Sequence, residues 1–120
     1  MIGDESRRVR GLSPAGRQQL ASLTESGIVH RSAFRDPSLR PILSELVARS
    51  AVVELEGGYI TSEEAVQQLL SRILPLLPAD SRAVARTLGH SHGGCRAFLS
   101  HLVRRGRLQY ADGLYCEVAA

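Results

Sequence analysis

The 120-residue sequence contains no tryptophan and no lysine, and it has only two phenylalanines and three tyrosines. With so few aromatic side chains, we expect a core built mainly from Leu, Val, Ile and Ala. Because lysine is absent, all 15 basic residues are arginine. This fits either the composition of the genome or a preference for the forked contacts that guanidinium groups make with phosphate. The net charge of +3 is a mild basic excess, which is compatible with a nucleic-acid partner but does not require one.

Further absences exclude several classes of protein. Only two cysteines occur, Cys95 and Cys116, and their spacing indicates neither a disulfide framework nor a zinc knuckle. The longest apolar run, residues 73–77, is interrupted by Pro75, and no apolar region follows the charged N-terminus. We therefore expect a cytoplasmic protein with neither a signal peptide nor a membrane span.

Motifs of catalysis are missing as well. No Gly-rich phosphate loop follows a predicted strand, and no Ser or Cys nucleophile has a base beside it. Glu63 and Glu64 are better interpreted as part of a helix cap than as an acid–base pair. Four potential metal ligands lie close together in the sequence without a firm zinc spacing: His90, His92, Cys95 and His101. We therefore predict no enzymatic activity, no cofactor and no metal.

The most informative pattern spans residues 80–118. Asp80 is a favourable N-cap for a short helix that Gly89 ends, and a second amphipathic helix begins a few residues later. Two short strands, 108–111 and 114–118, flank the dipeptide Asp112-Gly113, which suits a tight turn because both residues tolerate positive φ. Two helices followed by a hairpin indicate a winged helix.

The same pattern occurs earlier in the chain. A shift of 56 positions, without any gap, aligns eight identical pairs: Arg40 with Arg96, Leu43 with Leu99, Ser44 with Ser100, Leu46 with Leu102, Val47 with Val103, Arg49 with Arg105, Gly57 with Gly113 and Tyr59 with Tyr115. We therefore predict a mostly α protein with small β-hairpins, built as two tandem winged-helix units at residues 12–60 and 61–120. A flexible basic N-terminal arm, residues 1–11, is expected to precede them.

Local signals place the other elements. Ser13-Pro14 predicts a helix that stops near Gly27, and residues 28–34 are expected to form a short helix or a turn. Asp36-Pro37-Ser38 is expected to cap the next helix. A capping box at residues 61–64 introduces a helix with a strong apolar face, which we expect to be the main contact between the units.

The second helix of the C-terminal pattern carries the candidate site. In winged helices this helix enters a nucleic-acid groove, and its first-turn amides favour phosphate. The candidate binding residues lie at its start and toward its far end: Ser91, His92, Arg96, Arg104, Arg105 and Arg107. Arginine can hold a phosphate or a guanine edge through two parallel bonds. Alternatively, these arginines form a solvated face that complements the helix dipole.

Several segments resemble the C-terminal tandem winged helices of the bacterial selenocysteine-specific elongation factor. They are Ser44 through Leu46-Val47, the wing at residues 56–60, the helix after Ser62-Glu63-Glu64-Ala65, and Arg86-Thr87-Leu88-Gly89 with Ser91. The similarity covers roughly residues 12–118. In that family a translational GTPase precedes this region, and the last winged helix binds the messenger RNA hairpin that marks a selenocysteine codon. The resemblance implies that this chain is that RNA-binding tail alone or a relative that has lost the GTPase, because no GTP-binding motif is present here.

The sequence also departs from that family. His92 and Gly93 stand where the family usually has Arg and Lys, and the family's paired Arg of the final wing falls on Gln109 and Tyr110. Our first hypothesis is a protein that binds a structured RNA, such as a messenger hairpin. The alternatives are a protein-interaction module with a protein partner and a regulator that binds duplex DNA.

Overall fold

The computed structural model describes residues 11–118, and most of them are helical. The elements in chain order are α2 (Pro14–Ser26), β1 (Val29–His30), η1 (Arg31–Phe34), α3 (Arg40–Ala48), β2 (Val53–Glu54), η2 (Glu56–Gly58), β3 (Tyr59–Thr61), α4 (Glu63–Ile73), η3 (Leu74–Leu76), α5 (Ser81–Leu88), α6 (His92–Arg104), β4 (Leu108–Ala111) and β5 (Leu114–Glu117), where η marks a 3-10 helix. Apart from Gly11, the predicted N-terminal arm lies outside the described residues. No helix among residues 11–118 is long and apolar enough to cross a lipid bilayer.

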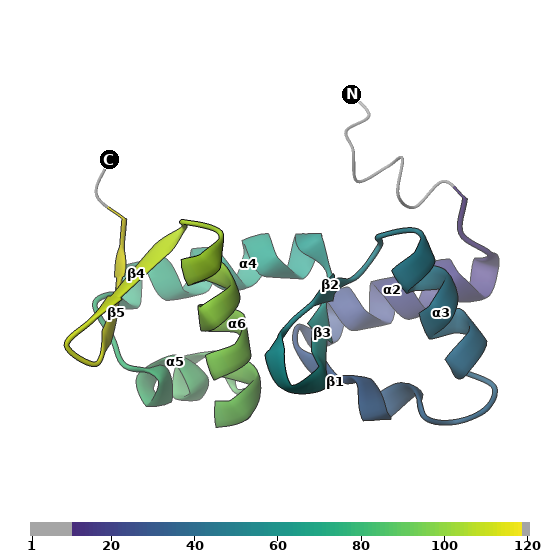
Figure 1. Cartoon of the computed structure of the whole chain (residues 1–120), viewed down its shortest axis with the longest axis horizontal. Coiled ribbons are helices and arrows are strands. Elements are labelled where there is room, and N and C mark those ends of the chain that lie inside the picture. Colours follow the sequence, from purple (N-terminus) through teal and green to yellow (C-terminus); the bar gives the residue numbers. More distant parts are fainter. Residues whose placement is uncertain (1–10, 119–120) are drawn as a thin grey trace.

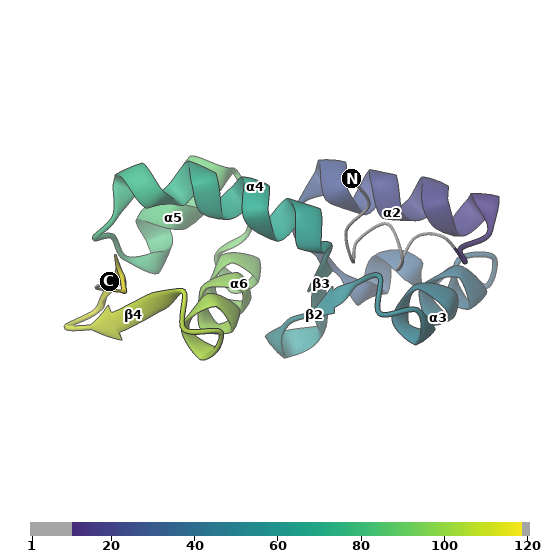
Figure 2. The ribbon, with the colours of Figure 1, turned by 90° about the horizontal axis from the view of Figure 1, so that it is seen from above.

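The molecule is elongated, with principal extents of 44 × 35 × 20 Å. Figure 1 shows α2, α3 and the first three strands toward one end, and α5, α6 and the β4–β5 hairpin toward the other. Helix α4 begins near the middle of the molecule, continues roughly in line with α2 and runs alongside α5 toward the second end (Figure 2). We refer to residues 12–60 as the first half and residues 61–118 as the second half.

Most of the helix boundaries follow the capping residues in the sequence. The Ser13 Oγ accepts a hydrogen bond from the Gly16 N–H, and the Asp80 carboxylate accepts one from the Ala83 N–H, so α2 and α5 begin where the sequence predicts. Gly89 ends α5 in the left-handed conformation with φ of 72°. The predicted hairpin is also present, with Asp112 and Gly113 at positive φ in the turn.

Two local predictions were wrong. Asp36 does not cap α3, because the helix begins one turn later with Leu39 at its N-cap and without a side-chain cap. The Asp36 carboxylate instead accepts a hydrogen bond from the Ser38 N–H at 2.9 Å within the preceding turn. The capping box before α4 is only half formed. Ser62 caps the Ala65 N–H, but position three of the helix is then alanine, so no carboxylate completes the box.

The strands form two small antiparallel sheets. In the first half β3 lies between β1 and β2, and Tyr59 pairs with His30. In the second half β4 pairs with β5, and Tyr115 forms an isolated bridge with Ala79. Tyr59 and Tyr115 are equivalent positions of the 56-residue repeat. Each pairs with a residue shortly after the long helix that opens its half, Tyr59 with His30 after α2 and Tyr115 with Ala79 after α4. The element order and these pairings make a winged-helix-like fold.

The buried core continues across both halves. One cluster joins side chains of α4, α5 and α6, among them Phe98, to three apolar residues of the first half, Ile28, Val53 and Leu55. Two smaller clusters, one around Leu46 and one around Phe34, lie wholly in the first half. Contacts between the halves therefore involve β2 and the segment after α2 as well as α4, which the sequence singled out. Helix α6 is held against this shared core.

Candidate nucleic-acid interface

Helix α6 exposes one stripe of polar side chains. Its start is fixed by Ser91, whose Oγ accepts a hydrogen bond from the Gly94 N–H at 3.1 Å. Four residues spaced at intervals of four form the stripe and share one face of the helix: His92, Arg96, Ser100 and Arg104. The side chains of Phe98 and Leu99 on the other faces are fully buried. Burial of the apolar faces thus leaves the polar stripe directed outward.

A groove of about 650 Å³ runs along this stripe. Its remaining walls come from Ser81 at the start of α5, Glu56 in η2 and the tyrosines of the β4–β5 hairpin. The His92 Nε2 and the Ser81 Oγ are 2.7 Å apart and share a hydrogen bond, which joins the start of α6 to α5. We name this cavity the α6 groove. It combines a helix face and a hairpin, the two parts with which winged helices contact nucleic acid.

Two tyrosines line the hairpin side of the α6 groove. Tyr110 is 57% exposed, and its ring centroid lies 4.7 Å from that of Tyr115, to which it is paired across the hairpin. Burial raises the pKa of Tyr115 above its ordinary value of 10.0, so this phenol is uncharged at neutral pH with a wider margin than a free one. An exposed aromatic ring beside cationic groups can stack on a nucleobase. Neither tyrosine was among the predicted site residues, although the predicted turn already places them opposite one another.

The two arginines of the α6 groove differ in their partners. Arg104 forms an ion pair with Glu56 of η2, and both side chains are more than half exposed. Arg96 makes no ion pair or hydrogen bond with any residue in the range 11–118, although its charge acts on Tyr115 nearby. The guanidinium of Arg96 is therefore the groove cation that a ligand could bind without displacing a carboxylate of the described chain.

The other predicted residues lie elsewhere. Arg105 and Arg107 line a separate pocket with Glu63 and His101. The Arg105 Nη2 lies 3.2 Å from the Glu63 Oε1 in an ion pair. Ser91 acts as the helix cap. The structure therefore brings His92, Arg96 and Arg104 together in the α6 groove and does not bring Arg105 and Arg107 to it.

Two glycines let the first half approach the start of α6. A Cβ on Gly94 would lie 3.3 Å from both the Ile28 Cγ2 and a ring carbon of Tyr59. A Cβ on Gly93 would lie 3.0 Å from the Tyr59 hydroxyl. Long basic side chains at these positions would have to displace Tyr59. The contact with β3 therefore gives a physical reason why the helix start carries glycine instead of further cations.

The four potential metal ligands do not assemble into a site. Cys95 is fully buried, and burial raises its thiol pKa to about 11, so it is not a thiolate at neutral pH. His101 lies on the buried side of α6, and burial lowers its pKa. No group of three or more His, Cys, Asp or Glu residues with a metal-binding arrangement occurs within residues 11–118.

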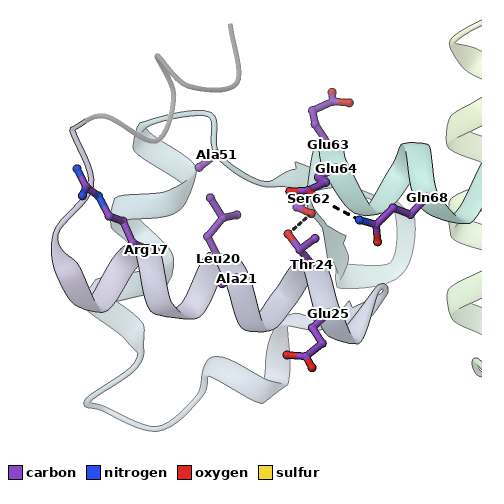
Figure 3. A pocket seen from close by; sticks show the side chains of 10 residues that line it. All are labelled: Arg17, Leu20, Ala21, Thr24, Glu25, Ala51, Ser62, Glu63, Glu64 and Gln68. Carbon is purple, nitrogen blue, oxygen red and sulfur yellow. Dashed lines mark hydrogen bonds between the residues drawn. The ribbon is translucent and has the colours of Figure 1, made fainter. Parts of the chain in front are cut away.

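A second pocket, of about 530 Å³, lies between α2 and the start of α4 (Figure 3). Leu20, Ala21 and Ala51 supply its apolar lining. The Thr24 Oγ1 and the Ser62 Oγ are 2.6 Å apart and share a hydrogen bond across it, one of the dashed lines in Figure 3. This pocket has an apolar lining and a polar rim, and the sequence pattern gave no sign of it because its walls come from distant segments.

The sequence matches no family model and no curated protein. Its structure, in contrast, is similar to one that has been solved. The chain has the fold of a segment of a bacterial selenocysteine-specific elongation factor. The crystal structure of that protein, EF-Sec, matches 95% of this chain with a TM-score of 0.73 and 14% sequence identity. The match spans only 19% of the EF-Sec chain. The resemblance expected from the sequence therefore holds at the level of the fold.

Proposed function

We propose that this chain is a tandem winged-helix protein, with units at residues 12–60 and 61–120, and that its second unit binds nucleic acid in the α6 groove. The observation that carries the proposal is the position of Arg96. It lies in a groove between a helix and a hairpin and has no carboxylate partner among residues 11–118. The proposed contacts are phosphate at Arg96 and Arg104, and base stacking at Tyr110.

The preferred ligand in this proposal is a structured RNA hairpin. The fold likeness to an elongation factor and the segments that resemble the RNA-binding region of that family both favour RNA over duplex DNA. An A-form stem offers phosphates to the arginines, and an unpaired loop offers bases to an exposed ring. The role proposed here is binding, without catalysis.

The test is fluorescence anisotropy with a labelled RNA stem-loop and a labelled DNA duplex at two salt concentrations. We expect tighter binding to the stem-loop and a dissociation constant that rises with salt. Arg96→Gln should weaken binding about tenfold or more, since a hydrogen bond to a charged group contributes about 1.5 to 3 kcal/mol. The matched control is Arg40→Gln, because Arg40 is the exposed repeat partner of Arg96 on α3.

The outcomes separate the hypotheses. Equal losses for the Arg40 and Arg96 variants would show that binding is not located in the α6 groove. Tighter binding to the duplex would favour a DNA-binding regulator. Absence of binding to both probes would leave the protein-interaction module, for which the apolar pocket between α2 and α4 is the supporting observation.

A further inference from the structure

Among residues 11–118, one carboxylate lines the α6 groove, that of Glu56, and it comes from the other half of the molecule. Glu56 lies in η2, 48 positions before Arg104 in the sequence, yet the two side chains form an ion pair. Helix α6 and η2 are in contact beside the groove, as Figure 1 also shows. The first half therefore contributes an anion to a groove whose cations belong to the second half.

We infer that Glu56 is an intramolecular competitor for the phosphate that Arg104 would otherwise bind. This inference rests on the proposed function and specifies how the affinity of the α6 groove is set. The Glu56 carboxylate accepts a hydrogen bond from the Arg104 Nη1, where a phosphate oxygen could accept the same bond, and its negative charge repels a phosphate placed beside it. A phosphate that binds at the Arg104 Nη1 must therefore displace Glu56 first.

The exposure of the pair makes this exchange feasible. The Arg104 and Glu56 side chains are 53% and 57% exposed, so water can solvate the released carboxylate. Exposed ion pairs change an equilibrium constant by at most about fivefold. Displacing Glu56 therefore costs little free energy, so the ion pair lowers the affinity of the groove for phosphate without preventing binding.

The groove charges support the same inference. Arg96 and Arg104 together carry two positive charges, and Glu56 cancels one of them. An isolated phosphate would bind at Arg96, the groove arginine that has no ion pair among residues 11–118. A ligand with several suitably spaced phosphates could displace Glu56 and use both arginines. Glu56 thereby favours a structured polyanion over scattered phosphate contacts.

The test compares Glu56→Gln with Glu54→Gln in the full chain. The two variants are matched: each removes one negative charge, each glutamate side chain is 57% exposed, and each forms an ion pair with an arginine. Glu54 pairs with Arg31 and does not line the α6 groove. We expect Glu56→Gln to lower the dissociation constant for a labelled RNA stem-loop about two- to fivefold. For the same variant, the slope of the logarithm of the dissociation constant against the logarithm of the salt concentration should steepen by about 0.7 to 0.9. Glu54→Gln should leave both quantities close to those of the unchanged protein.

A second comparison tests the route through Arg104. In an Arg104→Gln background, the additional Glu56→Gln change should no longer tighten binding. Tightening that persists there, or equal effects of the Glu54 and Glu56 variants, would overturn the inference and leave only a general charge effect. If Arg96→Gln weakens binding while Glu56→Gln has no effect, the proposed function stands and the inference fails. If neither the unchanged protein nor the Glu56 variant binds the stem-loop or a DNA duplex, both fail.

Discussion

The repeat offers a stringent test of whether the two halves fold together. Leu46 in α3 and Leu102 in α6 occupy equivalent positions of the 56-residue repeat, and their exposed fractions are 0% and 1%. Replacing either with alanine removes a fully buried side chain and leaves a cavity. Such substitutions cost about 2 to 5 kcal/mol. For a chain of this size, a loss of about 3 kcal/mol lowers the melting temperature by roughly 10 °C.

The structure predicts that both variants shift one common transition. Leu46 packs in a cluster that Val52 contacts, and Val52 also contacts the cluster containing Ile60 on β3. The next residue, Val53, belongs to the large cluster that includes Leu102. Because these clusters are connected through β2 and β3, loss of packing in one half should destabilise the other.

Differential scanning calorimetry and far-ultraviolet circular dichroism measure this directly. We expect a single transition for the unchanged protein and for both variants, with the midpoint lowered in each. Two separate transitions, with Leu46→Ala moving only one of them and Leu102→Ala only the other, would refute the argument. In that case halves of about 60 residues, near the lower size limit for an independent core, would be folding alone.

Three further predictions concern local interactions. Ser13→Ala removes the cap of α2 together with the hydrogen bond that the Ser13 hydroxyl donates to Glu45, and should cost about 1 kcal/mol in urea denaturation, whereas unchanged stability would contradict the role of the cap. Gly89→Ala meets no atom within 4 Å but must adopt a φ of 72°, so it should cost about 1 to 2 kcal/mol through backbone strain alone, and a stabilising effect would be inconsistent with that backbone conformation. Burial lowers the pKa values of His90 and His101 from 6.5, so the unfolded chain takes up protons first and the free energy of unfolding should fall as the pH drops below about 6.5. A free energy of unfolding that stays constant or rises between pH 7.5 and pH 5 would contradict this.

Local chemistry made much of the fold predictable from the sequence. Ser13, Asp80 and Ser91 are caps, and Asp112-Gly113 tolerates a turn, because these properties belong to a residue and its immediate neighbours. The pairing of β1 with β3 was not predicted, since strands of two and three residues are too short to show an alternating pattern. Asp36 was misassigned because the turn before α3 offers its carboxylate the Ser38 amide.

The candidate site was predictable only in part, for the same reason. The periodicity of α6 is local, so Arg96 and Arg104 could be placed on a helix from the sequence. The ion-pair partners of Arg104 and Arg105 could not be predicted, because Glu56 and Glu63 are 48 and 42 positions away from them. Which arginines face a groove and which are held by carboxylates is decided by how the halves pack.

The start of α6 connects this packing to binding. Tyr59 of the first half lies against Gly93 and Gly94, so positions 93 and 94 cannot carry a larger side chain unless Tyr59 moves. The positive charge of α6 is consequently displaced along the stripe to Arg96 and Arg104, where the next contact from the first half, Glu56, meets it. One half therefore determines both where the cations of the other half lie and how strongly they are neutralised. It follows that substitutions in η2 and β3, far in sequence from α6, should change affinity for a polyanion more than conservative changes on the buried faces of α6 itself.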